Sequence, residues 1–162
     1  MEPDVTPELL SFYALLENAF PETGIAVFFD ESKSAYLNEL RAVHFNGQDW
    51  RLVNFPDDEN DSIGAAFGLL HEGSQLYYLA AYMRESIIDP YYQKECLNYL
   101  KSYSRPDGLM AQMNPYQRES IVWYCDLIEK QVAELPMMDR LGYAFELMAT
   151  KHIRNVIRNT TW

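Results

Sequence analysis

Three places in this sequence carry the same helix-starting pattern, in which a short polar residue stands directly before proline: Thr6-Pro7, Asp89-Pro90 and Asn114-Pro115. The polar side chain accepts a hydrogen bond from a backbone N–H of the first turn, and proline suits the first helical position because no N–H is needed there. Gln117 stands three residues after Asn114, which is the spacing of a capping box. Apolar residues at helical spacing follow each pattern, so we predict helices over 7–20, from residue 90 onward and over 115–134.

Further helices are expected between and after these starts. One begins at Asp30 or Ser32 and ends near Val43, after the only strand-like run, 25–29, which has no second strand to join. Turn and loop signals then lead to helices over 63–70 and 75–88, which Gly73-Ser74 separates. The last helix is expected over 136–158, and its buried face is expected to contain Leu141, Phe145, Met148, His152 and Val156.

The helix expected over 75–88 is apolar nearly all round, which is typical of a helix in the middle of a bundle. The chain has 162 residues, of which 48% are hydrophobic, and this suits one globular domain with its own core. We therefore predict an all-α fold, a single-domain bundle of about six or seven helices that spans residues 1–162.

The sequence shows no sign of export or membrane insertion. Its first residues, Met1–Asp4, are acidic, whereas a secretory signal begins with basic residues and an apolar run. The longest apolar candidate, Leu76–Met83, is far shorter than the roughly 20 residues of a membrane span. Cys96 and Cys125 form no C-x-x-C pair, so we expect reduced, partly buried thiols. These features predict a cytoplasmic protein with no membrane partner.

The net negative charge lies entirely in residues 1–74, because acids and bases are balanced in the rest of the chain. The net charge is −11, and residues 1–74 hold 14 acids and three bases, whereas residues 75–162 hold ten of each. Binding to nucleic acid is not expected, because it needs clustered lysine and arginine. Net charge by itself keeps a protein soluble, and that explanation stays open. The other explanation is an acidic face that attracts a basic protein partner.

No residue pattern indicates catalysis, a metal or a cofactor. The cluster Asp57–Asp61 fails as an EF-hand, since its sixth and twelfth positions hold Ser62 and Gly68 instead of glycine and an acid. The sequence contains no G-x-S-x-G, no P-loop and no dinucleotide-binding glycine pattern. No pair of histidines has the spacing of a zinc site; the three are His44, His71 and His152. We therefore predict that the protein is not an enzyme and has no catalytic residue, metal site or cofactor.

Seven of the twelve tyrosines lie between Tyr77 and Tyr103. Such a group is typical of a core whose hydroxyls reach polar partners. An exposed aromatic patch for binding is the alternative, because tyrosine and tryptophan are enriched at binding hot spots.

The middle of the chain resembles an uncharacterised family of small helical bacterial proteins, a domain of unknown function. The resemblance covers roughly residues 10–135 and lies in the segments 45–50, 67–70 and 77–83 and in Gln117. In the family an aromatic pair is often followed by Leu-Pro-Ala-Tyr, and Ala80 stands here where that proline would be. The resemblance implies a shared helical fold. It carries no known activity, so it assigns no functional residue.

These features favour an immunity-type protein that binds a basic toxin or nuclease in the cytoplasm. The expected contact surface is acidic, with Trp50 and Phe55 as apolar anchors, and consists of Asp49, Trp50, Phe55, Asp57, Asp58, Glu59 and Asp61. One alternative is an acidic DNA mimic or regulatory adaptor, which requires carboxylates spaced like phosphates. The other is an enzyme of unrecognised type, which requires a deep pocket around one of the three histidines.

Overall fold

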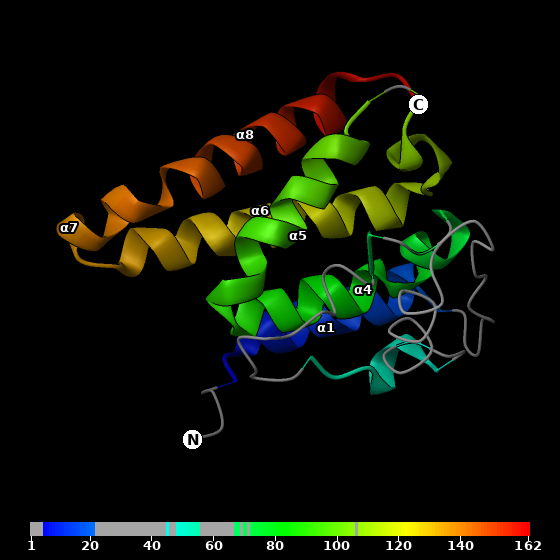
Figure 1. The fold of residues 1–162 in the computed structure, drawn as a ribbon, viewed down its shortest axis with the longest axis horizontal. Coiled ribbons are helices and arrows are strands. Elements are labelled where there is room, and N and C mark those ends of the chain that lie inside the picture. The colour runs from blue at the N-terminus through cyan, green and yellow to red at the C-terminus, as the bar shows by residue number, and fades with distance from the viewer. Residues whose placement is uncertain are drawn as a thin grey trace. The chain divides into compact units, whose positions relative to one another are not determined.

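The computed structural model describes residues 5–21, 45, 48–55, 67–68, 70, 72–105 and 107–162. Its regular structure there is helical, and no residue in these ranges belongs to a strand. Figure 1 shows the helices α1 (Pro7–Ala19), α4 (Glu72–Ile88), α5 (Pro90–Tyr103), α6 (Pro115–Glu134), α7 (Met137–Arg140) and α8 (Ala144–Asn159). Short 3₁₀ helices are η1 (Trp50–Leu52), η2 (Leu109–Gln112) and η3 (Leu141–Tyr143). The all-α prediction is confirmed for this part of the chain.

The three predicted helix starts are confirmed. The Thr6 hydroxyl accepts a hydrogen bond from the Leu9 N–H at 3.3 Å, and Asp89 Oδ1 accepts one from the Tyr91 N–H at 2.9 Å. Asn114 forms the complete capping box: its side chain accepts from the Gln117 N–H at 2.9 Å, and Gln117 Oε1 accepts from the Asn114 N–H at 3.0 Å. Local sequence therefore fixes where α1, α5 and α6 begin.

The start of α4 differs from the prediction. The helix begins at Glu72, so Gly73 and Ser74 lie inside its first turn and do not precede it. Gln75, which is buried, donates to the carbonyls of Phe67 and Gly68 at 3.3 and 3.1 Å. The helices expected over 30–43 and 63–70, the strand-like run 25–29 and the loop 56–62 lie wholly or mostly outside the described residues.

Contacts along the chain define two compact units, residues 1–20 with 86–162 (unit 1) and residues 21–85 (unit 2). The divisions therefore fall after Phe20 and after Glu85. A single domain over residues 1–162 stays a prediction. None of the described helices is long and apolar enough to cross a membrane.

Unit 1 is built around α6, which packs against α1 and α8, while α5 packs against α8. In Figure 1, α6 and α8 form a hairpin with α7 at its tip. Arg154 of α8 makes ion pairs with Asp126 and Glu129 of α6 at 2.6 and 3.0 Å, and the Thr150 hydroxyl lies 2.7 Å from Glu129 Oε1. Burial raises the pKa of Glu129, but the hydrogen bonds from Arg154 and Thr150 outweigh it, and the pKa is lowered on balance.

The prediction for the last helix is wrong in its continuity and in its buried face. The expected helix over 136–158 is divided into α7, η3 and α8. Leu141 and Met148 are 73% and 70% exposed, His152 is exposed, and Phe145 and Val156 are half-buried. The buried positions of α8 are Glu146, Ala149, Thr150 and Ile153. On this inward side Thr150 and Arg154 also make polar contacts with α6, which the spacing of apolar residues does not reveal.

The loop before α6 depends on one glycine. Gly108 lies so close to the preceding helix that a Cβ there would stand 2.5 Å from the carbonyl oxygen of Tyr103. Any larger residue there would have to displace backbone, which gives a steric reason for this glycine.

Unit 2 contains the apolar helix segment that the sequence predicted as central. All residues from Tyr77 to Met83 are at most 2% exposed. Tyr78 and Tyr82 pack against Phe45 and Phe67, with ring centroids 4.8 Å apart in both pairs. Four of the seven clustered tyrosines are buried, namely Tyr77, Tyr78, Tyr82 and Tyr92, whereas Tyr91 is exposed. The core interpretation of these tyrosines therefore holds for most of them.

Candidate functional site

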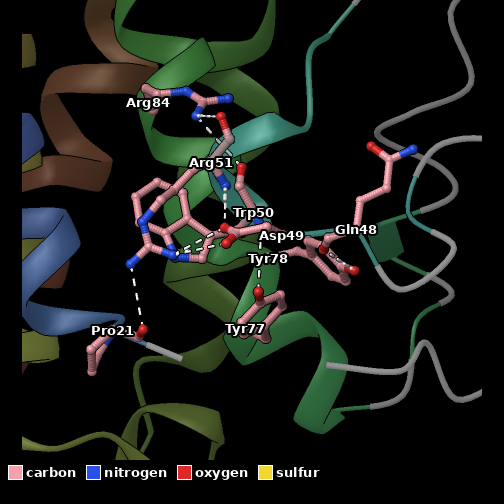
Figure 2. A network of polar contacts seen from close by, with 8 residues as sticks. All are labelled: Pro21, Gln48, Asp49, Trp50, Arg51, Tyr77, Tyr78 and Arg84. Carbon is pink, nitrogen blue, oxygen red and sulfur yellow. Dashed lines mark hydrogen bonds and ion pairs between the residues drawn. The ribbon is translucent and has the colours of Figure 1, made fainter. Parts of the chain in front are cut away.

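The segment 48–55 of unit 2 carries three of the residues that the sequence selected for partner binding, Asp49, Trp50 and Phe55. Figure 2 shows the first two with their polar contacts. Asp49 caps η1: its Oδ1 accepts hydrogen bonds from the backbone N–H and from Nη1 of Arg51, both at 3.0 Å. Arg51 also donates from Nη2 to the carbonyl of Pro21 at 3.5 Å. The Asp49 carboxylate is thus already paired with a guanidinium inside its own unit.

Two tyrosines of α4 make hydrogen bonds with the backbone of the same segment. The Trp50 N–H donates to the Tyr77 hydroxyl at 3.4 Å, and the Tyr78 hydroxyl lies 2.7 Å from the carbonyl oxygen of Gln48. Burial, together with the charges of Tyr77 and Asp49, raises the pKa of Tyr78 well above its usual range. The hydroxyl therefore remains a hydrogen-bond donor to the backbone.

Arg84 of α4 completes the arrangement. Its Nη1 lies 3.5 Å from the carbonyl oxygen of Trp50 and 2.9 Å from that of Arg51, and its Nη2 donates to the carbonyl of Val53. An ion pair of 2.7 Å with Glu85 orients the guanidinium. The Trp50 ring carries two guanidinium groups, with the Arg51 and Arg84 carbons 4.8 and 5.8 Å from its centroid. We call Asp49, Arg51, Tyr77, Tyr78 and Arg84 the backbone clamp.

The backbone clamp changes the role of two predicted contact residues. Trp50 is 2% exposed and Phe55 is 8% exposed, with the Phe55 ring packed edge-on against Tyr82 at 5.0 Å. Their side chains belong to the core of unit 2 and do not form surface anchors. Asp49 keeps 23% of its side chain exposed. Asp57, Asp58, Glu59 and Asp61 lie outside the described residues, so a common contact surface of the seven residues stays a prediction.

The described residues contain no group of three or more histidine, cysteine, aspartate or glutamate side chains that could hold a metal. His152 is exposed on α8, and His44 and His71 lie outside the described residues. The backbone clamp itself offers no free nucleophile, because each of its polar groups has a partner within unit 2. Its chemical effect is to fix the backbone of residues 48–53.

Unit 1 contains a buried group that sequence analysis missed. The Ser86 and Tyr124 hydroxyls lie 2.6 Å apart in the interior, and both also interact with the thiol of Cys96. Burial raises the pKa of Cys96 to about 12, and it raises the pKa of Cys125 further. Residues 86, 96 and 124 have no informative spacing, since they come from three different helices. The two cysteines are free and buried.

We expect neither thiol to react with 5,5′-dithiobis(2-nitrobenzoic acid) at pH 8 while the protein is folded. A fully buried thiol with a raised pKa has almost no thiolate, so labelling requires opening of the structure and should be at least ~100-fold slower than in denaturant. Absorbance of the released thionitrobenzoate measures both rates. A native rate equal to the denatured rate at either position would contradict the burial of Cys96 and Cys125.

Neither a scan of protein-family models nor searches of curated proteins and of solved structures finds a match for this chain.

Proposed function

We propose that this chain is an immunity-type protein, which binds and neutralises a basic toxin or nuclease through the acidic half of its sequence. The observation that carries the proposal is the uneven charge: residues 1–74 hold 14 acids and three bases, whereas residues 75–162 hold ten of each. Proteins that act on nucleic acid carry basic surfaces. A complementary acidic surface raises the rate of encounter and helps to orient the partners.

The backbone clamp supports the proposal because it fixes the chain just before the most acidic segment. Val53 accepts a hydrogen bond from Arg84, and Phe55 packs against Tyr82. Asp57, Asp58, Glu59 and Asp61, which we call the acidic loop, follow directly in the sequence. A binding segment attached to a fixed point loses less conformational entropy on association than one attached to a loose chain.

Several expectations from the sequence belong to the same proposal. The protein acts in the cytoplasm, as a binding protein without catalytic residue, metal or cofactor, and its partner is a basic protein rather than nucleic acid or membrane. Its whole chain forms a single-domain bundle of about six or seven helices, related to the uncharacterised bacterial family that it resembles.

Reversing three charges of the acidic loop tests the proposal. We expect Asp57→Lys, Asp58→Lys and Asp61→Lys together to slow association with the basic product of a neighbouring toxin-like gene by about tenfold at low salt, since electrostatic steering depends on opposite charges. Stopped-flow association rates measure the effect, and it should shrink as salt screens the charges. Circular dichroism should show an unchanged helix content.

A matched control reverses three exposed acids of the balanced half, Asp107, Glu119 and Asp139, to lysine. This variant has the same net charge, and we expect it to associate at nearly the rate of the original protein. Equal slowing in both variants would show that net charge alone acts and would remove the acidic loop from the proposal. Binding only to a DNA-binding regulator would favour the DNA-mimic alternative.

A further inference from the structure

A groove crosses unit 1 along α6. A cavity of about 290 Å³ is lined by the beginning of α1, by the last turn of α4 and by α6. A second cavity of about 210 Å³ adjoins it closer to the N-terminus of α6. Glu8, Leu127 and Lys130 line both cavities. We call the two together the α6 groove.

The charged groups that line the α6 groove are mostly acidic. Glu8 and Lys130 form an ion pair where the two cavities meet, and each side chain remains more than half exposed. Asp126 lines the smaller cavity and Glu134 the larger. Three carboxylates therefore stand around one ammonium. Asp126, which is 54% exposed, also pairs with Arg154, whose side chain is only 17% exposed and lines neither cavity.

The same groove has an apolar lining. Leu9, Ile87, Ile88 and Leu127 line the larger cavity, and Trp123, which is 39% exposed, lines the smaller one. A half-exposed tryptophan beside a cavity is typical of a binding hot spot. The complementary ligand is thus apolar in its middle and cationic at its ends.

The spacing of the acids sets the length of that ligand. Asp126 and Glu134 are eight residues apart on α6, which is about 12 Å at the helical rise of 1.5 Å per residue. An extended peptide covers about 13 Å in four residues. Two basic side chains at positions i and i+4 lie on the same side of such a peptide and would therefore reach both carboxylates, and an apolar side chain at i+2 would face the groove between them.

We propose that the α6 groove binds a short basic segment of a protein partner, whose cationic side chains pair with Asp126 and Glu134 and whose apolar side chains contact Leu127 and Ile88. The class of partner rests on the proposed function. The surface is a different one, because all groove residues belong to unit 1.

The test uses the full chain and the probe acetyl-Arg-Ser-Leu-Ser-Arg-amide, whose binding is followed by the indole N–H resonances in ¹H–¹⁵N NMR spectra. We expect the resonance of Trp123 to shift with millimolar peptide and that of Trp50, which is 2% exposed, to stay in place. Trp123→Phe assigns the resonance. Acetyl-Arg-Ser-Ser-Ser-Arg-amide has the same charge without the leucine and should bind several-fold more weakly.

Two variants should act in opposite directions. Lys130→Gln frees Glu8 and makes the groove more acidic, so it should tighten peptide binding about two- to fivefold, whereas Glu134→Gln should weaken it by a similar factor. Glu119→Gln, an exposed position of α6 outside the groove, carries the same charge change as Glu134→Gln and should leave binding unchanged.

Equal binding of both peptides, or equal effects of Glu134→Gln and Glu119→Gln, would show general charge attraction and overturn the proposal. Absence of a Trp123 shift would do the same. If spermidine bound as tightly as the leucine-containing peptide, the groove would be assigned to small amines instead of a protein segment. The two proposals fail separately: reversal of the acidic loop is expected to leave peptide binding intact, and the toxin association rate does not enter the peptide measurement.

Discussion

Ile153→Ala lowers the free energy of unfolding by about 2–4 kcal/mol, whereas Met148→Ala changes it by less than about 0.5 kcal/mol. Ile153 is fully buried on the side of α8 that faces inward, so its truncation leaves a cavity and removes apolar contacts. Met148 is 70% exposed one and a half turns earlier in the same helix. Both substitutions introduce alanine, which favours a helix, so helix propensity does not explain a difference between them.

Urea denaturation followed by circular dichroism measures this pair of variants. The two variants distinguish the alternatives, because the sequence pattern places Met148 on the buried face of the helix and does not include Ile153 in it. A larger loss for Met148→Ala than for Ile153→Ala would restore the face predicted from spacing and contradict the orientation of α8.

Arg84→Met should lower the free energy of unfolding by about 2–4 kcal/mol, because the carbonyls of Trp50, Arg51 and Val53 lose a charged donor in a largely buried place. Methionine keeps most of the apolar stem, so the loss reports on the hydrogen bonds more than on packing. Urea denaturation gives the free energy, and Trp50 fluorescence should move to longer wavelength as water reaches the ring.

Two controls accompany Arg84→Met. Arg84→Lys keeps the charge, but one ammonium cannot reach several carbonyls. Its free energy of unfolding should therefore lie between those of the original protein and Arg84→Met. Glu85→Gln removes the ion-pair partner and leaves the carbonyl donors, so it should cost less than about 1 kcal/mol. If Arg84→Met and Glu85→Gln cost the same, the guanidinium acts through the ion pair and the backbone clamp is not a stabilising feature.

The backbone clamp also explains why the candidate site was only partly predictable. Its members come from residues 49–51 on one side and from Tyr77, Tyr78 and Arg84 on the other. Sequence identified Asp49 and Trp50 as notable but offered no way to pair them with a helix about 30 residues later. Burial of Trp50 and Phe55 is a consequence of that pairing, and it turns two expected surface anchors into core residues.

What the sequence determined by itself is local. The caps at Thr6, Asp89 and Asn114 follow from hydrogen bonds between residues two or three positions apart, so they need no knowledge of the rest of the fold. The burial of Tyr77–Met83 was equally predictable, because a helix that is apolar on every side has no face to turn toward water.

Only the tertiary structure determines which face of a helix is buried and which polar groups far apart in the sequence become partners. On α8, apolar side chains occur on more than one side, so spacing leaves the rotation of the helix open. In the fold, the side that contains Ile153 faces α6, and Thr150 and Arg154 contact Glu129 and Asp126 there. Likewise only the fold places Arg84 against the carbonyls of Trp50, Arg51 and Val53. It also brings α1 beside α6 to form the groove around Glu8 and Lys130. These pairings join residues far apart in the chain, and their energy depends on distance in space rather than on separation in sequence.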